Sequence, residues 1–463
     1  MDRCVMRQCV SRLLAAVLVL PGVALPQGRS DSSAVVAATG ASVRVGADTT
    51  PPDTTFTYAA AMHIAEVVSA AIQNSPSMAQ AVGALRVGQS GDRVAYGEFL
   101  PFVTLNAAGM QSGQHSLSGA TLAGSFPSQS YSAGIAASYE LFTGGRREAD
   151  IAAARATTRS ANAGLVQQRY AVTLLAKETF FADRRARDLV RVSTDAVVTA
   201  DRALQYAEAR MRRGTATRAD VLLARLNLTT ARQQLIAARD TLTTNAYALG
   251  RLVGVPGAVA AEGTDSLPSV ALAMPDSAVV ALAVGASPGV RAADEFARAS
   301  DASLHAASTQ YVPDVKLIGG YTWANNSIAF SAVRPGWVVE LATSYPLFNG
   351  FIREDDVTRA SAAAHTARVT ATDERRFARA EAERLLAAVR FAWENIAEAE
   401  EGSRVAEENF RVVSVRYQNG VATFLDLSTA QLDEAQARVA LVTARYTYQI
   451  ARASLEALVG RDL

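Results

Sequence analysis

Two short segments of the chain carry a glycine, a threonine and an aspartate at the same spacing. They are Gly214, Thr217 and Asp220 in one segment, and Gly420, Thr423 and Asp426 in the other. Glycine can adopt the positive φ that ends a helix. A threonine three residues before an acidic residue can form a capping box, in which each side chain binds a backbone amide at the start of a helix. The spacing therefore predicts two tight helix-to-helix turns, each with an acidic side chain at the start of the second helix.

Other residue types that commonly do chemistry are scarce and are not spaced for it. The chain has two lysines, Lys177 and Lys316, and neither follows the glycine that a phosphate-binding P-loop requires. The four histidines, at positions 63, 115, 305 and 365, lack the spacing of a zinc site such as His-Glu-x-x-His. We therefore expect no catalytic residue, no metal and no cofactor, and we do not expect an enzyme.

Charge and composition exclude a further class of protein. The 463 residues include 45 basic and 44 acidic side chains, a formal net charge of +1, so the chain lacks the basic surface of a nucleic-acid-binding protein. Apolar residues make up 49%, but only 7% are aromatic and 19% are charged. Because alanine supplies much of the apolar share, the composition favours closely packed helices without one thick core.

The N-terminal residues have the order of a secretory signal peptide. Three arginines precede the apolar run 13–20, and small residues lead to a cleavage position near Ala24. This run is too short to cross the ~30 Å hydrocarbon core of a membrane. Both cysteines precede it, so we expect a mature chain without cysteine or lipid anchor. Residues 1–24 are thus a predicted signal peptide, and residues 25–55, rich in small and polar residues, a flexible leader.

The chain contains a tandem duplication. Ser75-Pro76 recurs 212 residues later as Ser287-Pro288. Matches 206 residues apart follow in the same order: Leu141-Phe142-Thr143-Gly144 with Leu347-Phe348-Asn349-Gly350, Gly214 with Gly420, and Asp220 with Asp426. The change in separation predicts a deletion in a loop of the second copy, between its two short apolar runs. The predicted divisions are a first repeat at 56–255, a linker at 256–275 and a second repeat at 276–463.

Each repeat has two stretches of alternating apolar and polar residues, as in a strand with one polar face. The apolar positions are Val103, Leu105 and Ala107, then Ile135, Ala137, Tyr139 and Leu141, then Val315, Leu317, Tyr321 and Trp323, and last Trp337, Val339, Leu341 and Tyr345. Glu140, Lys316 and Glu340 occupy the alternate positions, so their side chains are expected on the other face of the strands. In an exported chain this pattern favours outer-membrane barrel strands, which are apolar outside and polar inside. The alternative is a soluble hairpin that packs on the helices.

Two long proline-free stretches, 146–213 and 352–419, predict helices longer than those of a globular domain. Unbroken, each would span on the order of 100 Å. Apolar residues recur in them at heptad spacing, for example at Val190, Val197 and Leu204, which implies left-handed coiled-coil packing. Each repeat is expected to run helix, strand, strand, long helix, glycine turn, long helix. The predicted fold class is mainly α with β.

Four strands of membrane-spanning length cannot close a barrel by themselves. An open edge in lipid leaves backbone groups without hydrogen bonds, at a cost of several kcal/mol each. The missing strands must come from other copies of the chain, and small residues on the long helices suit close contacts with neighbouring helices. We therefore expect a ring of protomers around a channel, and these arguments leave the number of protomers open.

The order of these parts resembles that of the TolC-type outer-membrane efflux family, from about Phe56 to Leu463. The resemblance rests on the duplicated plan, on the Leu-Phe-x-Gly sequence before each long helix, and on the turns at 214–222 and 417–427. It implies a homotrimer whose strands form one β-barrel in the outer-membrane lipid and whose coiled-coil helices form a periplasmic α-barrel. A mixed equatorial region, which includes the linker, surrounds this α-barrel.

Members of the family are passive exit ducts of tripartite efflux or type I secretion systems. The resemblance therefore implies docking with a periplasmic adaptor, or membrane fusion, protein and with an inner-membrane RND, ABC or MFS pump. The alternative is an exported periplasmic coiled-coil protein that tethers layers of the envelope. Alternating strands favour the duct, because a coiled-coil tether does not need them.

The resemblance also assigns roles to residues near the second turn. Asp426 matches an acidic position of the periplasmic constriction, whereas Thr429 stands where the family has a second acidic residue. Tyr417 and Asp220 match positions that hydrogen-bond between neighbouring hairpins and hold the tunnel shut. The aspartates thus keep two open roles, as helix caps and as gate residues.

Further assignments concern the adaptor, a second latch and the barrel. Ala422 stands where the family has a latch arginine, so that part is missing or replaced, with Arg218 as a candidate. The tips expected to dock the adaptor are Gly214, Thr215, Ala216, Thr217, Gly420, Val421, Ala422 and Thr423. The residues expected to face the barrel lumen are Glu140, Lys316 and Glu340.

Overall fold

The computed structural model describes residues 57–113, 127–263, 274–325 and 334–461. The predicted signal peptide, the leader and the loop to which the sequence assigns the deletion all lie outside the described residues. None of the helices in these ranges is both long enough and apolar enough to cross a membrane.

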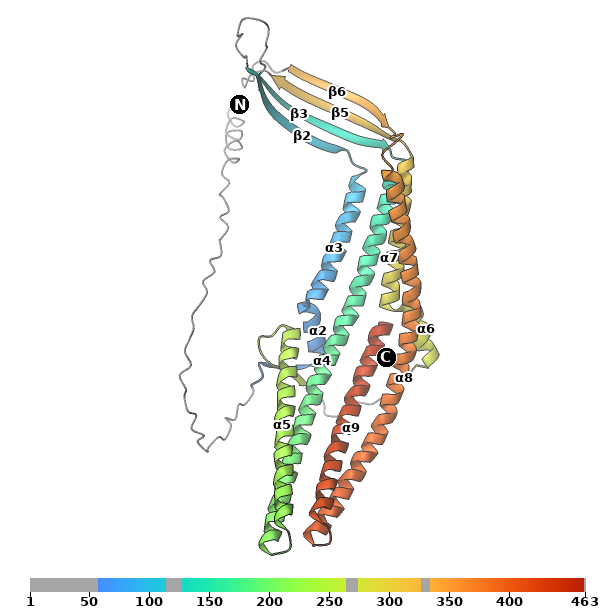
Figure 1. Ribbon diagram of the computed structural model, residues 1–463. Coiled ribbons are helices and arrows are strands. Elements are labelled where there is room, and N and C mark those ends of the chain that lie inside the picture. Colours follow the sequence, from blue (N-terminus) through green and yellow to red (C-terminus); the bar gives the residue numbers. More distant parts are fainter. Residues whose placement is uncertain (1–56, 114–126, 264–273, 326–333, 462–463) are drawn as a thin grey trace. The chain divides into compact units, whose positions relative to one another are not determined.

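The two copies have the same order of helices and strands (Figure 1). The first contains α2 (Ile64–Asn74), α3 (Pro76–Gly97), β2 (Phe102–Gly113), β3 (Pro127–Phe142), α4 (Arg146–Arg212) and α5 (Arg218–Val253). The second contains α6 (Asp276–Ala286), α7 (Pro288–Ser308), the short 3-10 helix η1 (Thr309–Tyr311), β5 (Asp314–Asn325), β6 (Arg334–Ser344), α8 (Ile352–Gln418) and α9 (Phe424–Val459). Helices α4 and α8 both have 67 residues, and α5 and α9 both have 36. The predicted duplication and the mainly α fold class are confirmed.

The first helix predicted in each copy is two helices in the structure, so that prediction is wrong. Helices α2 and α3 meet at Ser75, and α6 and α7 meet at Ser287, each just before a proline that starts the next helix. Proline has no amide hydrogen for the preceding turn and holds the residue before it in an extended conformation. The ψ angles of 124° at Ser75 and 146° at Ser287 are extended, so one helix cannot run through either position.

Ser287 has a structural role at this break. Its side chain is buried, and its Oγ accepts a hydrogen bond from the Val290 amide at 3.3 Å, which caps α7. The surrounding segment, Gly285–Gly289, has the Gly-x-Ser-x-Gly spacing of a hydrolase nucleophile elbow. An elbow joins a strand to a helix, whereas this serine lies between two helices, so the segment is a helix cap.

A two-stranded parallel sheet that the sequence did not predict joins the two ends of the first copy. Strand β1 (Ala60–His63) pairs with β4 (Val259–Glu262), which lies in the predicted linker. Asp183 of α4 is fully buried, and its Oδ2 accepts hydrogen bonds from the Ala261 amide at 3.0 Å and from Arg187 at 3.3 Å. Burial raises the pKa of the Asp183 carboxyl, and these two donors partly oppose the shift.

The other strands form one antiparallel sheet in the order β2-β3-β5-β6 (Figure 1). Glu140 lies opposite Lys316, and Ile318 lies opposite Glu340. Because side chains alternate along a strand and cross-strand partners share a face, Glu140, Lys316 and Glu340 all lie on one face. The opposite face carries exposed apolar side chains, among them Val103, Leu105, Ile135, Leu317, Trp337, Val339 and Leu341.

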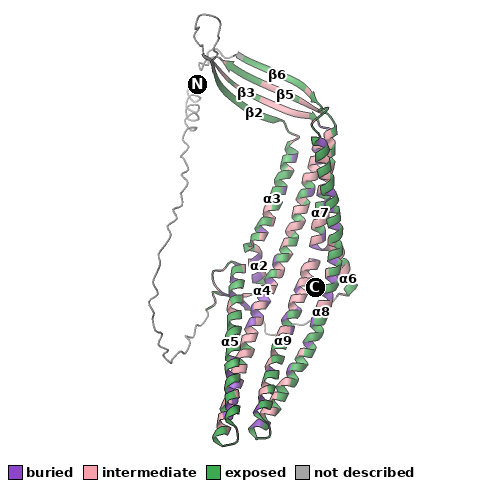
Figure 2. Cartoon of the chain, in the orientation of Figure 1, coloured by how far each residue is buried: buried purple, intermediate pink, exposed green. Residues whose placement is uncertain are grey.

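The long helices pack as two hairpins, α4 with α5 and α8 with α9, and α9 also packs against α4. Buried residues form short patches along the helices and leave most of the surface exposed, as Figure 2 shows. Small side chains let helices approach closely. The alanine-rich composition therefore serves lateral helix contacts, as in α4, where the buried residues include Ala176, Ala186, Ala200, Ala203 and Ala207.

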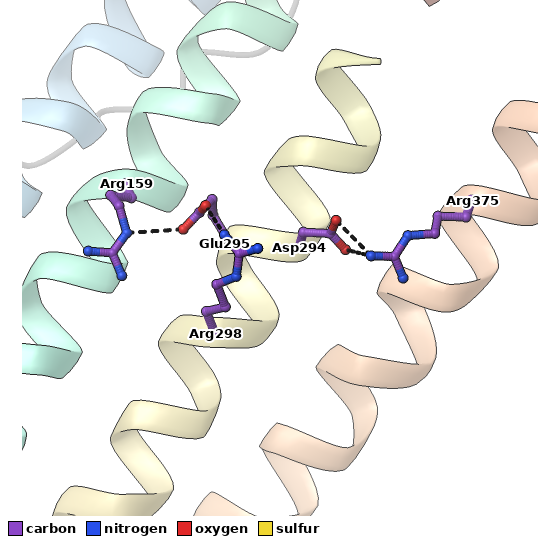
Figure 3. Close-up of polar contacts among 5 residues, drawn as sticks. All are labelled: Arg159, Asp294, Glu295, Arg298 and Arg375. Atoms are coloured by element: carbon purple, nitrogen blue, oxygen red, sulfur yellow. Dashed lines mark hydrogen bonds and ion pairs between the residues drawn. The ribbon is translucent and has the colours of Figure 1, made fainter. Parts of the chain in front are cut away.

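Helix α7 packs against both α4 and α8 and carries ion pairs to each (Figure 3). Glu295 Oε2 lies 3.1 Å from Arg159 Nε of α4, and Glu295 also pairs with Arg298 within α7. Both oxygens of Asp294 accept from Arg375 Nη2 of α8, at 2.7 and 2.8 Å. Ion pairs this exposed contribute only ~0–1 kcal/mol each. The Arg159–Glu295 pair joins the two copies, whereas the Asp294–Arg375 pair joins two helices of the second copy.

Candidate functional site

The two predicted turns have nearly identical backbones. Gly214 and Gly420 have φ angles of +73° and +81°, and the amide of the residue after each glycine donates to a carbonyl of the preceding helix at 2.9 Å. Asp220 Oδ2 accepts from the Thr217 amide at 2.8 Å, and Thr217 Oγ1 accepts from the Asp220 amide at 3.2 Å. The second turn repeats these capping bonds at 2.9 and 3.2 Å. The predicted capping boxes are confirmed.

Asp426 is the acidic residue at the start of α9. The hydrogen bonds from the Thr423 amide and hydroxyl lower the pKa of its carboxyl, and the side chain is exposed, so it stays ionised at neutral pH. Thr429 lies one turn further along α9, and its hydroxyl donates to the Leu425 carbonyl at 3.0 Å. Of these two residues, only Asp426 carries a negative charge, because Thr429 is neutral.

Tyr417 lies in the last turn of α8 and is only 2% exposed. It packs edge to face on Phe424, with ring centroids 5.9 Å apart. Burial raises the pKa of the Tyr417 hydroxyl, Arg210 opposes this shift, and the charge of Asp220 adds to it. Among the described residues the hydroxyl has no hydrogen-bond partner. Within the single chain, Tyr417 and Asp220 are therefore not joined by a hydrogen bond.

Arg210, near the end of α4, was not picked out by sequence reasoning. Its Nη1 donates to the Tyr417 carbonyl at 2.7 Å, and its Nη2 donates to the Thr215 carbonyl at 3.2 Å. Its guanidinium carbon lies 4.5 Å from the centroid of the Tyr417 ring. A signal was present in the sequence, because Arg210 and Arg416 each stand four residues before a turn glycine.

The predicted docking residues differ in exposure. Gly214, Thr215 and Thr217 of the first turn are exposed and Ala216 is half-buried, while in the second turn Gly420, Val421 and Thr423 are exposed. Ala422 is buried instead, in the cluster that also contains Tyr417 and Phe424. At the position of the family's latch arginine, this chain thus has a small residue that packs inside the tip.

A groove with a cavity volume of about 260 Å³ lies between the hairpins, lined by α4, α5 and α9. Arg438 forms ion pairs there with Glu434 at 2.8 Å, with Glu407 of α8 at 3.0 Å and with Asp195 of α4 at 3.8 Å. Glu434 is buried, and this burial raises the pKa of its carboxyl, while Arg438 opposes the shift. The charged network joins three of the four long helices.

The polar face of the four-stranded sheet brings two of its three predicted residues into contact. Lys316 Nζ lies 3.3 Å from Glu140 Oε1 and 3.2 Å from Asp314. Glu140 also accepts from Arg146 at 2.8 Å. Glu340 shares this face but lies opposite Ile318. Across the ranges that the structure describes, no three histidine, cysteine or acidic side chains are grouped as metal ligands would be.

Two long helical hairpins in tandem, with a four-stranded sheet that has one apolar and one polar face, are the protomer fold of outer-membrane channels. The fold is similar to solved structures of CusC (19% identity, TM-score 0.75), of the outer membrane protein VceC from Vibrio cholerae (20%, 0.73) and of the MtrE outer membrane channel of Neisseria gonorrhoeae in its open state (22%, 0.71). Each alignment covers 86% of this chain, and 92%, 96% and 89% of the respective structures. The search of curated proteins returned no match.

The sequence profile described as outer membrane efflux protein matches residues 67–255 and 279–461, one range in each copy. The chain therefore belongs to the outer membrane efflux protein family. It is an outer-membrane transport protein. The TolC-like resemblance of the sequence is confirmed.

Proposed function

We propose that the protein is the passive outer-membrane exit duct of a tripartite efflux or type I secretion system. The observation that carries this proposal is the four-stranded sheet, which has one apolar face, one polar face and, among the described strands, two edges without a partner. In lipid such edges must be paired. A homotrimer supplies the pairing strands, directs the apolar face to lipid and lines the lumen with Glu140, Lys316 and Glu340.

The proposal extends to the tunnel tip. The two turns are the periplasmic end, where Asp426 lines the constriction and Tyr417, Asp220 and Thr429 lie around it. The exposed turn residues dock a periplasmic adaptor, which joins the duct to an inner-membrane pump of the RND, ABC or MFS class. Exposure of Thr215 and Val421 supports this, because a docking surface must be accessible.

Assembly and conductance test the duct directly. We expect a heat-modifiable trimer in the outer-membrane fraction that forms ion-conducting pores in planar bilayers. A soluble periplasmic dimer without conductance would overturn the proposal and favour the coiled-coil tether.

In-cell photo-crosslinking tests the docking surface. A crosslinking residue at Thr215 or Val421 should capture a periplasmic adaptor that also crosslinks to an inner-membrane transporter. The same residue at Thr370, which is exposed in α8 far from either turn, is the matched control and should capture less of it. Equal capture at Thr370 would contradict docking at the tips.

A further inference from the structure

The two turns are duplicates in sequence but make different contacts. Arg210 and Arg416 hold equivalent positions, 206 residues apart. Arg416 is exposed, whereas Arg210 is half-buried and reaches across to the second hairpin. The residues that face it differ as well, because Tyr417 of the second copy corresponds to Met211 of the first. Only one of the two arginines is therefore placed to join the tips.

Arg210 binds both turns at once. Its hydrogen bond to the Tyr417 carbonyl holds the last turn of α8, and its bond to the Thr215 carbonyl holds the turn of its own hairpin. A guanidinium presents several donors in a planar fork, so it can bridge two carbonyls that lysine could not bridge as well. Its position over the Tyr417 ring adds a cation–π contact.

The C-terminal end of α8 favours a cation at this place. The last carbonyls of a helix have no partner within the helix and carry partial negative charge. The Tyr417 carbonyl is one of these, and it accepts two hydrogen bonds from outside the helix, from the Gly420 amide at 3.1 Å and from Arg210 at 2.7 Å. The Tyr417 ring is fixed by Phe424 and by burial, so the arginine meets a rigid surface. Asp220 cannot substitute for this contact, because a carboxylate has no hydrogen to donate to the Tyr417 carbonyl. Its Oδ2 accepts from the Thr217 amide and hydroxyl instead.

We propose that Arg210 is the positioning residue that holds the second hairpin turn against the first within each protomer, and that the tip opens when its bond to the Tyr417 carbonyl breaks. This inference rests on the proposed duct function. It assigns the contact within a protomer to Arg210, and it does not require a hydrogen bond between Tyr417 and Asp220.

Single-channel recording tests the proposal. Loss of the one charged hydrogen bond that joins the hairpins should raise the open-to-closed ratio of Arg210→Ala at least about tenfold. Arg210→Lys should give an intermediate ratio, because lysine keeps the charge but lacks the fork. Arg416→Ala is the matched control and should keep the wild-type open-to-closed ratio, because Arg416 acts on Asp426 of its own hairpin and not on the other turn. A wild-type ratio in Arg210→Ala, or an equal rise in Arg416→Ala, would overturn the proposal.

A distance measurement provides a readout that a loss of folding would not mimic. Spin labels at Ala219→Cys and Val421→Cys, both exposed, report the separation of the turns in heat-stable trimers. We expect the distance distribution to broaden in Arg210→Ala and to keep its width in Arg416→Ala. If Arg210→Ala does not form trimers, Arg210→Lys is measured in its place. A wild-type distance distribution together with a wild-type open-to-closed ratio in Arg210→Lys would then overturn the proposal. If wild type does not conduct, the duct proposal fails, while this distance comparison still decides the role of Arg210.

Discussion

Asp426 keeps its negative charge because its own capping box stabilises the ionised form. Hydrogen bonds from the Thr423 amide and hydroxyl lower the pKa of the carboxyl below its ordinary value of about 3.9. A carboxyl whose pKa is lower in the folded protein than in the unfolded protein stabilises the fold at pH values above the unfolded-state pKa. This stabilisation is lost as the pH falls through the folded-state pKa. At pH 5 both the cap and the charge should therefore persist.

For a channel constricted at this residue, we expect cation preference at pH 7 and at pH 5. Asp426→Asn should shift the reversal potential in a salt gradient toward zero at both values, since asparagine can still accept the capping bonds but carries no charge. Asp220→Asn, the equivalent change in the other turn, should shift it less. Unchanged selectivity in Asp426→Asn would remove this residue from the constriction.

Single residues also mark how far the sequence can be interpreted. The capping boxes were predictable because all their bonds form within a few residues, and their spacing repeats. The Arg210 bond joins residues 207 positions apart, and nothing in either segment shows which arginine of the duplicate pair would be used. Ala422 could be recognised as a departure from the family, but its burial follows from the packing of two hairpins.

Among the helices and strands, predictability followed the strength of local periodicity. Strands β2, β3, β5 and β6 alternate clearly, and the long helices have heptads and lack proline. Strands β1 and β4 are short and alanine-rich, and they pair across roughly 200 residues, so no local pattern identified them. The breaks before Pro76 and Pro288 follow from a local rule that the single-helix prediction did not apply.

The connection from β3 to α4 gives a prediction at this scale. Gly144 and Gly145 both have positive φ, at +62° and +86°. A Cβ on Gly144 would overlap the Val312 side chain, whereas one on Gly145 would meet no atom within 4 Å. Gly145→Ala should cost about 1–2 kcal/mol of stability from backbone strain alone. Gly144→Ala should cost about 1–3 kcal/mol more, because overpacking adds to the strain.

Thermal unfolding of the purified protein measures both changes. We expect a larger fall in midpoint for Gly144→Ala than for its neighbour. Equal falls would mean that the Val312 side chain can move aside at no cost, and that only the φ angle matters at this turn.

The assembled molecule can be tested through two adjacent valines of β6. Val338 and Val339 are both exposed in the single chain, at 50% and 66%, but lie on opposite faces of the sheet. An arginine facing lipid near the membrane midplane costs about 2–4 kcal/mol, whereas lumen positions tolerate charge. Val339→Arg should therefore lower the amount of trimer in the outer membrane.

Val338→Arg is the matched control and should assemble like wild type. Heat-modifiable trimer in membrane fractions is the measurement for both variants. Equal loss in the two variants would indicate that the sheet does not separate lipid from a lumen, and the barrel assignment would have to be abandoned.

The equal lengths of α4 and α8, and of α5 and α9, restrict how this protein can change in size. Removing one heptad from each arm of a single hairpin would shorten it by about 10 Å, so its turn would no longer lie beside the other turn. Arg210 could then not reach Tyr417. Only a deletion made at equivalent positions in all four helices would preserve that contact, so insertions and deletions in this part of the chain must occur as coordinated sets.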